Sequence, residues 1–277
     1  MEFLFFDNSF ILLKMTFLAK EAGSMEKQSS RQIMILQLFE KSRPVWTVGQ
    51  MTRALGLPES TIYRHVRNLV TAQFLDPVTG AGYALGPAFI RYESILRETD
   101  PLILHATPVM AALLAQASPY CTVLLSRRFK DCVMCVHELR GRKSGETGYG
   151  RGVSMPMFLG ATSKSILAQL PPRTLKAVYL ANEETIRRVL QIRDWNQFRA
   201  NVKEIRRAGF VMSKSEVTKG RIGIAAPITR NGQPFASISL AGTGWSKKKI
   251  DSYIPLVRDA AAQISKSLSR EAAIISR

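Results

Sequence analysis

The chain has 277 residues, enough for two domains of ordinary size. Hydrophobic residues make up 46% of it and the mean hydropathy is −0.01, which indicates a soluble, globular protein. Its three cysteines, an odd and small number, argue against a disulfide scaffold and favour a reducing compartment.

The positive charge is unevenly distributed along the chain. The net charge is +18. Residues 26–100 hold nine Lys or Arg and seven Asp or Glu, a balance of +2, whereas residues 101–277 hold 28 and 11, a balance of +17. The excess in the second part could attract an anionic small molecule, add non-specific affinity for nucleic acid, or simply form a solvated surface.

Residues 1–24 contain two apolar clusters, at 3–6 and 10–13. The stretch is too short and too interrupted for a membrane span. A signal peptide is not expected either, because Glu2 and Asp7 stand where such peptides carry positive charge. We expect an extension, either disordered or the product of a mis-assigned start, with the folded chain beginning at Met25. The expected location is the cytoplasm, with no membrane partner.

Two short helices and a glycine break are predicted next. Ser30 can cap a helix over 31–40. Thr47 can cap another, which would turn Met51, Ala54 and Leu55 inward, and Gly56-Leu57-Pro58 then interrupts the helical pattern.

A second helix follows this break, with Ile62, Val66, Leu69 and Val70 at helical spacing. After it, 74–75 and 83–85 read as strands around a flexible turn at 76–82. Helix, glycine turn, helix and hairpin together predict a winged helix-turn-helix over residues 25–86.

The exposed face of the second helix favours DNA binding over a purely structural role. It carries small hydroxyls, a tyrosine and cations, which bond phosphates and base edges: Ser60, Thr61, Tyr63, Arg64 and Arg67. The first four would reach bases in the major groove, with Arg64 the best candidate for guanine, while Arg67 would hold the backbone. The structural alternative is a pair of amphipathic helices in an ordinary core. His65 is given no role.

Residues 87–100 are predicted as a linker helix, and 101–277 as a second domain. Strands are expected at 120–127, 132–139, 210–214, 222–229 and 234–241, and helices at 107–117, 162–170, 172–180, 183–192, 196–208 and 247–275. Asn231-Gly232 predicts a hairpin between the last two strands. This order implies an α/β or α+β domain with an antiparallel sheet.

The cysteines could form a zinc site, but we consider this hypothesis weaker than a structural role for them. Cys132 and Cys135 form a CxxC with His137 nearby, and Cys121 would be a fourth zinc ligand. On a strand, however, residues three apart point to opposite faces and could not readily share a metal ion. We therefore expect buried structural cysteines and no metal or cofactor.

Motifs for catalysis are also missing from the sequence. There is no GxSxG or GxGxxG, and in the segment 160–165 Ser163 stands where a Walker A loop needs glycine. The second domain is therefore interpreted as a binder and not as an enzyme.

Several segments occur in the order and spacing of a known family. They are the helix-turn-helix and wing, GVSMPMFLGATSKSILA at 152–168, RAGF at 207–210 followed by Glu216 and GRIGIAAPI at 220–228, and ASISLAG at 236–242. On these segments, the chain resembles the IclR-type transcriptional regulators over residues 30–275.

The resemblance implies a winged helix-turn-helix joined by a helix to a GAF-like effector domain, in a dimer or a dimer of dimers without enzymatic activity. It also implies an effector pocket lined by Gly160, Ala161, Thr162, Ser213, Arg221, Gly223, Ser239 and Ala241. The chain departs from the usual pattern at Ser163-Lys164-Ser165, where Gly-Lys-Ala is common, and at Ser213-Lys214, where acids are frequent.

The residue types in this pocket suggest a small organic acid, and aromatic acids are among the candidates. Thr162, Ser213 and Ser239 offer hydrogen bonds, and Arg221 could clamp a carboxylate unless it points to solvent or pairs with Glu216. Backbone N–H groups after Ala161 also favour an anion. The leading hypothesis is a regulator that binds a pseudo-palindromic double-stranded operator and senses this acid. The alternatives are an α/β enzyme with an added DNA-binding domain and an architectural DNA-binding protein without an effector.

Overall fold

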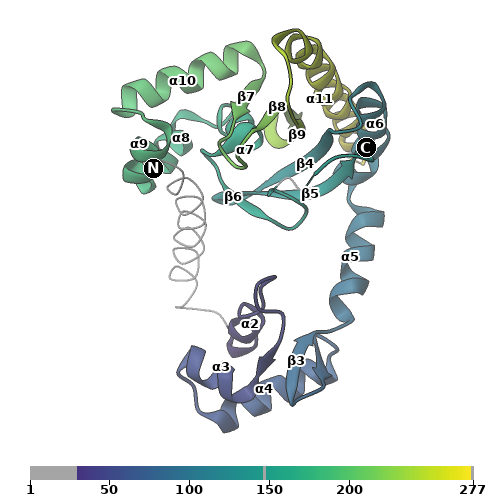
Figure 1. Ribbon diagram of the computed structural model, residues 1–277, viewed down its shortest axis with the longest axis vertical. Coiled ribbons are helices and arrows are strands. Elements are labelled where there is room, and N and C mark those ends of the chain that lie inside the picture. Colours follow the sequence, from purple (N-terminus) through teal and green to yellow (C-terminus); the bar gives the residue numbers. More distant parts are fainter. Residues whose placement is uncertain (1–29, 146–147, 276–277) are drawn as a thin grey trace. The chain divides into compact units, whose positions relative to one another are not determined.

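The computed structural model describes residues 30–145 and 148–275, and the predicted extension lies outside them. The chain divides into two compact units, Met1–Thr99 and Asp100–Arg277 (Figure 1).

The first unit is a small helical domain with a three-stranded antiparallel sheet. Its elements are α2 (Arg31–Leu36), β1 (Trp46–Thr47), α3 (Val48–Leu55), α4 (Glu59–Thr71), β2 (Leu75–Val78), β3 (Gly82–Leu85) and α5 (Ala88–Thr99). The strand order is β1-β3-β2. The predicted winged helix-turn-helix is therefore confirmed. One predicted boundary is wrong: α2 ends at Leu36 and not at residue 40, since the chain turns there and Leu38 and Phe39 pack back on the core.

The turn between α3 and α4 is fixed by local chemistry. The Thr47 hydroxyl accepts from Gln50 N–H, and the Gln50 side chain accepts from Thr47 N–H, which completes a capping box. Gly56 ends α3 with φ of 65°, a conformation that favours glycine. Met51 faces inward as predicted, but Ala54 is exposed because the buried face of this short helix is narrow.

The core of the first unit holds α4 in place. Its fully or nearly fully buried residues are Ile35, Trp46, Met51, Ile62, Val66, Leu69 and Leu75. Three of them come from one face of α4, as the helical spacing predicts. The opposite face of α4 is therefore left for solvent or a partner.

The wing is longer than predicted. β2 runs through Asp76, Pro77 and Val78, so only residues 79–81 form the turn. Pro77 is tolerated because β2 is an edge strand of its sheet, where a missing N–H leaves no neighbour unpaired.

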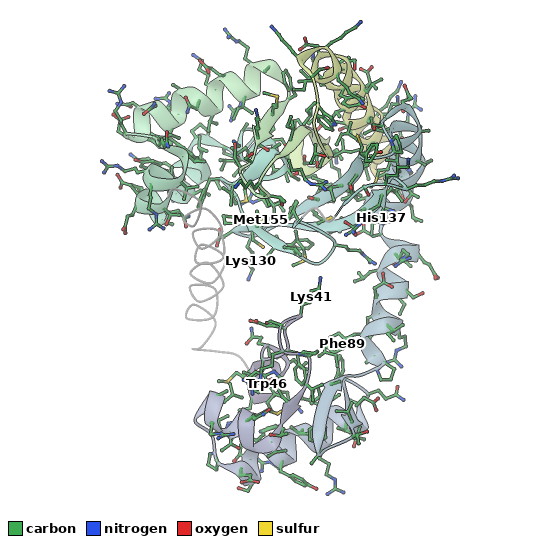
Figure 2. All side chains as sticks on the ribbon, viewed as in Figure 1. Lys41, Trp46, Phe89, Lys130, His137 and Met155 are labelled. Atoms are coloured by element: carbon green, nitrogen blue, oxygen red, sulfur yellow. The ribbon has the colours of Figure 1, made fainter. Side chains whose placement is uncertain are left out.

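The N-terminal part of helix α5 is anchored to the first unit by aromatic contacts. The ring of Phe74 packs edge-on against Phe89 and stacks on Tyr92, with centroids 5.5 and 5.9 Å apart. Phe89 is labelled in Figure 2. Farther along α5, Ile95 and Leu96 are 49% and 60% exposed.

The second unit is built on a six-stranded antiparallel sheet in the order β6-β5-β4-β9-β8-β7. Its strands are β4 (Thr122–Phe129), β5 (Cys132–Arg140), β6 (Ser154–Pro156), β7 (Val211–Lys214), β8 (Arg221–Arg230) and β9 (Gln233–Thr243). Its helices are α6 (Pro101–Gln116), α7 (Gly160–Leu167), α8 (Pro172–Ala181), α9 (Glu183–Leu190), α10 (Trp195–Ala208) and α11 (Lys247–Ile275). The predicted α+β class with an antiparallel sheet is confirmed.

The two faces of this sheet differ in side-chain size. One face packs against α6 and α11 with large apolar residues, such as Ile224 of β8 and Ile238 and Leu240 of β9 (Figure 1). The other face lies under α7 and carries small residues that alternate with those, mainly Gly223, Ala225, Ser237, Ser239 and Ala241. Small side chains beneath a buried helix leave room between the sheet and that helix.

The β8–β9 hairpin has the predicted turn. Asn231 and Gly232 have φ of 50° and 74°, the positive values that a two-residue turn between twisted strands needs.

In this unit one predicted boundary is wrong and one strand was not predicted. Helix α6 begins at Pro101, not at residue 107, with the Asp100 side chain accepting from Leu102 N–H. The helix continues through Pro108 because Leu102, Ile103 and their neighbours are buried on the sheet; each such burial is worth about 1.5–3 kcal/mol, enough together to offset a proline cost of about 3 kcal/mol. Strand β6 was not predicted, being only three residues long.

Within the described part of the chain, none of the helices combines the length and the apolar content that crossing a bilayer requires.

Candidate nucleic-acid interface and ligand cavity

The outer face of α4 presents the predicted DNA-reading residues. Ser60, Tyr63, Arg64 and Arg67 are exposed, Tyr63 to 60%, and Thr61 is half-buried. The four predicted base readers, Ser60 to Arg64, lie within the first two turns of the helix, which starts at Glu59. A helix entering the major groove contacts base edges with its N-terminal residues. The geometry is suited to that role.

His65 lies on the same helix with both ring nitrogens buried and without a hydrogen-bond partner among the described residues. Burial, and then the charges of Arg64 and Arg31, lower the pKa of His65 below its usual value of 6.5. The native state therefore binds fewer protons than the unfolded state as the pH falls through 6.5, so its stability should decrease there.

We expect His65→Gln to remove this contribution. Denaturant unfolding of the full chain at a pH of about 7.5 and about 5.5 should show a smaller loss of unfolding free energy for the variant than for the wild type. Equal pH dependence of the two proteins would contradict the assignment.

A cavity lies between α7 and the small-residue face of the sheet. The unfilled space is about 490 Å³ when its open mouth is included, and about 50 Å³ of it admits the centre of a water-sized sphere. That interior has room for a few water molecules, or for a small ligand in their place. Met155 of β6, labelled in Figure 2, forms part of its wall.

All eight residues predicted for the effector pocket line this one cavity. They come from the start of α7, from β7, from β8 and from β9: Gly160, Ala161, Thr162, Ser213, Arg221, Gly223, Ser239 and Ala241. A Cβ at Gly223 would lie 3.4 Å from Ser213 Oγ and 3.6 Å from Ala161 Cβ, in contact with two other residues that line the cavity.

The N-terminus of α7 is already occupied by groups of the protein itself. Gly160 N–H donates to Glu216 Oε2 at 3.0 Å, and Ala161 N–H donates to Ser213 Oγ at 3.1 Å. The sequence predicted an anion at the backbone N–H groups after Ala161, and the two N–H groups that precede those are not available to a ligand. Both donors are satisfied within the protein.

Glu216 makes a second contact, with a cation. Its Oε1 lies 2.6 Å from Lys164 Nζ, and both side chains are largely shielded from solvent, at 25% and 16% exposure. The carboxylate thus neutralises Lys164 while lining the cavity.

The hydroxyls in the cavity keep donors available. Ser213 Oγ accepts from Ala161, which leaves its own hydrogen free to donate. Thr162 Oγ1 donates to Ser239 Oγ at 3.1 Å, which leaves the Ser239 hydrogen. Both serines therefore suit a ligand rich in acceptor oxygens.

Arg221 lines the cavity with one donor nitrogen unused. Its Nη2 donates to the carbonyl of Gly145 at 3.0 Å, whereas the buried Nη1 has no hydrogen-bond partner among the described residues. Burial, and then the charge of Arg140, lower the pKa of Arg221. The side chain does not pair with Glu216, which bonds Lys164. A buried guanidinium nitrogen without an acceptor favours an anion at that place.

Comparison with known protein families decides the identity. The family model described as the IclR helix-turn-helix domain matches residues 30–78, and the model described as the bacterial transcriptional regulator IclR C-terminal domain matches residues 96–266. The chain belongs to the IclR family. It is an IclR-type transcriptional regulator with a DNA-binding helix-turn-helix and a C-terminal effector domain.

Relatives of this IclR-family protein agree along nearly their whole length. The HTH-type transcriptional regulator KipR of Bacillus subtilis is 25% identical over 241 residues, which cover 86% of this chain and 95% of KipR. The crystal structure of Thermotoga maritima IclR matches with a TM-score of 0.66 and 20% identity, covering 90% of this chain and 99% of that one.

A second solved structure was crystallised with a ligand. An IclR homologue from Microbacterium hydrocarbonoxydans, complexed with 4-hydroxybenzoate, matches with a TM-score of 0.70 and 20% identity, over 86% of this chain and 97% of that one. At 20% identity, these two structures show that the fold is shared.

The sequence did not identify every lining residue of the cavity in this IclR-family protein. Eight further residues contribute: Leu124, Tyr149, Met155, Leu159, Glu216, Val217, Thr218 and Ile222. Leu124 could have been found from its register, since it pairs with Ser239 across β4 and β9. Tyr149 lies in a glycine-rich loop whose sequence carries no such signal.

The three cysteines of this protein are all buried and form no disulfide within the part of the chain that the structure describes. Burial raises the pKa of the Cys135 thiol to about 12, so it stays protonated at neutral pH. Cys132 and Cys135 lie on β5, as predicted, and no group of three potential metal ligands occurs among the residues that the structure describes.

Proposed function

We propose that this regulator binds a pseudo-palindromic operator through α4 of two protomers, and that a small organic acid bound in the α7 cavity changes that binding. The assignment of residues is part of the proposal: Ser60, Thr61, Tyr63 and Arg64 read bases, Arg67 holds the backbone, and the eight residues predicted from the sequence contact the acid. No catalytic step is proposed.

The observation that carries the ligand class is the buried Arg221 Nη1, in a cavity that is also lined by two serine hydroxyls that can still donate. Three donors around one small cavity match a carboxylate and a second oxygen better than a neutral hydrocarbon. The 4-hydroxybenzoate bound by the Microbacterium homologue is a molecule of this class. We therefore use it as the reference probe.

Self-association is proposed from the exposed apolar residues of α5. Ile90, Ile95 and Leu96 are exposed to between 49% and 73%. Apolar side chains exposed to this degree on one short helix fit a contact with a second copy. A dimer, or a dimer of dimers, would present two reading helices to one operator.

Selection from random DNA tests the DNA-binding part of the proposal. The full chain should enrich sequences with two inverted half-sites whose centres are about one helical turn apart, or a multiple of it. Enrichment of a single unrepeated site, or of no sequence at all, would contradict binding as a two-fold dimer.

A further inference from the structure

We propose that Glu216 acts as a resident anion, which closes the α7 N-terminus to the ligand carboxylate and so orients an acidic effector toward Arg221. This inference rests on the function proposed above and adds a specificity-determining residue to it.

Both carboxylate oxygens of Glu216 already accept hydrogen bonds within the protein. Oε2 accepts from Gly160 N–H at 3.0 Å, and Oε1 accepts from Lys164 Nζ at 2.6 Å. A helix N-terminus and a lysine together are the groups that a ligand carboxylate would seek. In this protein, a carboxylate of the chain already holds both.

The backbone around Glu216 fixes this arrangement. Gly160 has φ of 76°, and a Cβ there would lie 2.9 Å from Val217 Cγ2, so the 216–217 segment packs directly on the start of α7. Ser213 holds the next N–H, that of Ala161. The segment from β7 to β8 therefore covers the helix terminus with its own acceptors.

The remaining charge in the cavity lies at Arg221. Of the residues that line it, Glu216 is the acid and Arg221 the cation. An incoming carboxylate finds Gly160 N–H and Lys164 already bonded to the first, and is attracted by the second, whose Nη1 has no partner among the described residues. The acid group should therefore bind at Arg221, with the rest of the ligand toward Thr162 and Ser239.

The test compares an acid with its neutral amide of the same shape. Affinities for 4-hydroxybenzoate and 4-hydroxybenzamide are measured by calorimetry on the full chain, as the wild type and as the variants Glu216→Gln and Lys164→Gln. In Glu216→Gln the oxygen of the introduced side chain can still accept from Gly160 N–H, but Lys164 loses its counter-charge. The ratio of the affinity for 4-hydroxybenzoate to that for 4-hydroxybenzamide should therefore rise about tenfold.

Lys164→Gln should act in the opposite direction. It leaves the Glu216 charge unneutralised beside the cavity, so the preference for the acid should fall about tenfold. A merely structural role of the ion pair would weaken both ligands alike in both variants. Glu183→Gln, which removes one negative charge from an exposed pair with Arg187 in the same unit, is the matched control and should change nothing.

The outcomes separate this inference from the proposed function. If the wild type prefers the acid and both Glu216→Gln and Lys164→Gln keep the same preference, the proposed role of Glu216 is wrong. The proposal of an acid-binding cavity would not be affected by that result. Wild type that binds neither probe, or both equally, contradicts the acid-binding cavity itself, and the inference falls with it. Melting temperatures of the variants show whether each remains folded.

Discussion

Replacing Arg64 by alanine is expected to weaken binding to the operator by about 1–3 kcal/mol, while affinity for random DNA changes much less. Arg64 is exposed within the second turn of α4, on the face opposite the buried Ile62, Val66 and Leu69. A bidentate arginine–guanine contact carries sequence information that a phosphate contact lacks. Fluorescence anisotropy with operator and scrambled duplexes of equal length measures both affinities.

Arg67→Ala is the matched control for this measurement. Arg67 is a cation on the same helix, about one turn farther on, where it would reach the DNA backbone. Its removal should weaken operator and scrambled DNA alike and reduce the salt dependence of binding by about one phosphate contact. If Arg64→Ala behaved in the same way as Arg67→Ala, Arg64 would be a backbone contact and the base-reading assignment would be wrong.

Replacing Arg221 by alanine is expected to abolish the response to an acidic effector at concentrations that saturate the wild type. A hydrogen bond to a charged group is worth about 1.5–3 kcal/mol, which corresponds to roughly 10- to 150-fold in affinity. DNA binding without ligand should remain, because Arg221 belongs to the second unit and the reading helix to the first. Operator titrations with and without 4-hydroxybenzoate, for the variant and the wild type, measure the effect.

A response of Arg221→Ala at the same acid concentration as wild type would contradict the carboxylate clamp. Ser239→Ala provides a graded comparison, because a neutral hydrogen bond contributes only about 0.5–1.5 kcal/mol. The Ser239 variant should therefore respond at a moderately higher acid concentration and not lose the response.

The first unit could be predicted well because its signals are local. The Thr47 cap, Gly56 and the spacing from Ile62 to Leu69 each act within one helix or one turn, and each is found in the structure. The boundaries of the wing were less accurate, because Pro77 suggests a turn and becomes an edge-strand residue only through pairing with β3.

Features of the second unit that depend on tertiary packing were harder to predict. The start of α6 was placed too late, since burial against the sheet overrides Pro108. The bonds of Glu216 to Gly160 and Lys164 join segments 52 to 56 residues apart, and no periodicity announces them. The resemblance to a family, and not spacing, identified eight of the residues that line the cavity.

We propose that a small acid bound in the cavity of the second unit changes DNA binding by helix α4 of the first unit. A ligand can do so only through different affinities for the DNA-competent and DNA-incompetent states. The most direct measurement is the operator Kd of the wild-type full chain, with and without each member of a panel of small aliphatic and aromatic carboxylic acids that includes 4-hydroxybenzoate. We expect at least one acid that binds the protein to shift this Kd by about fivefold or more. An unchanged operator Kd with every acid, including those shown by calorimetry to occupy the protein, would contradict the account.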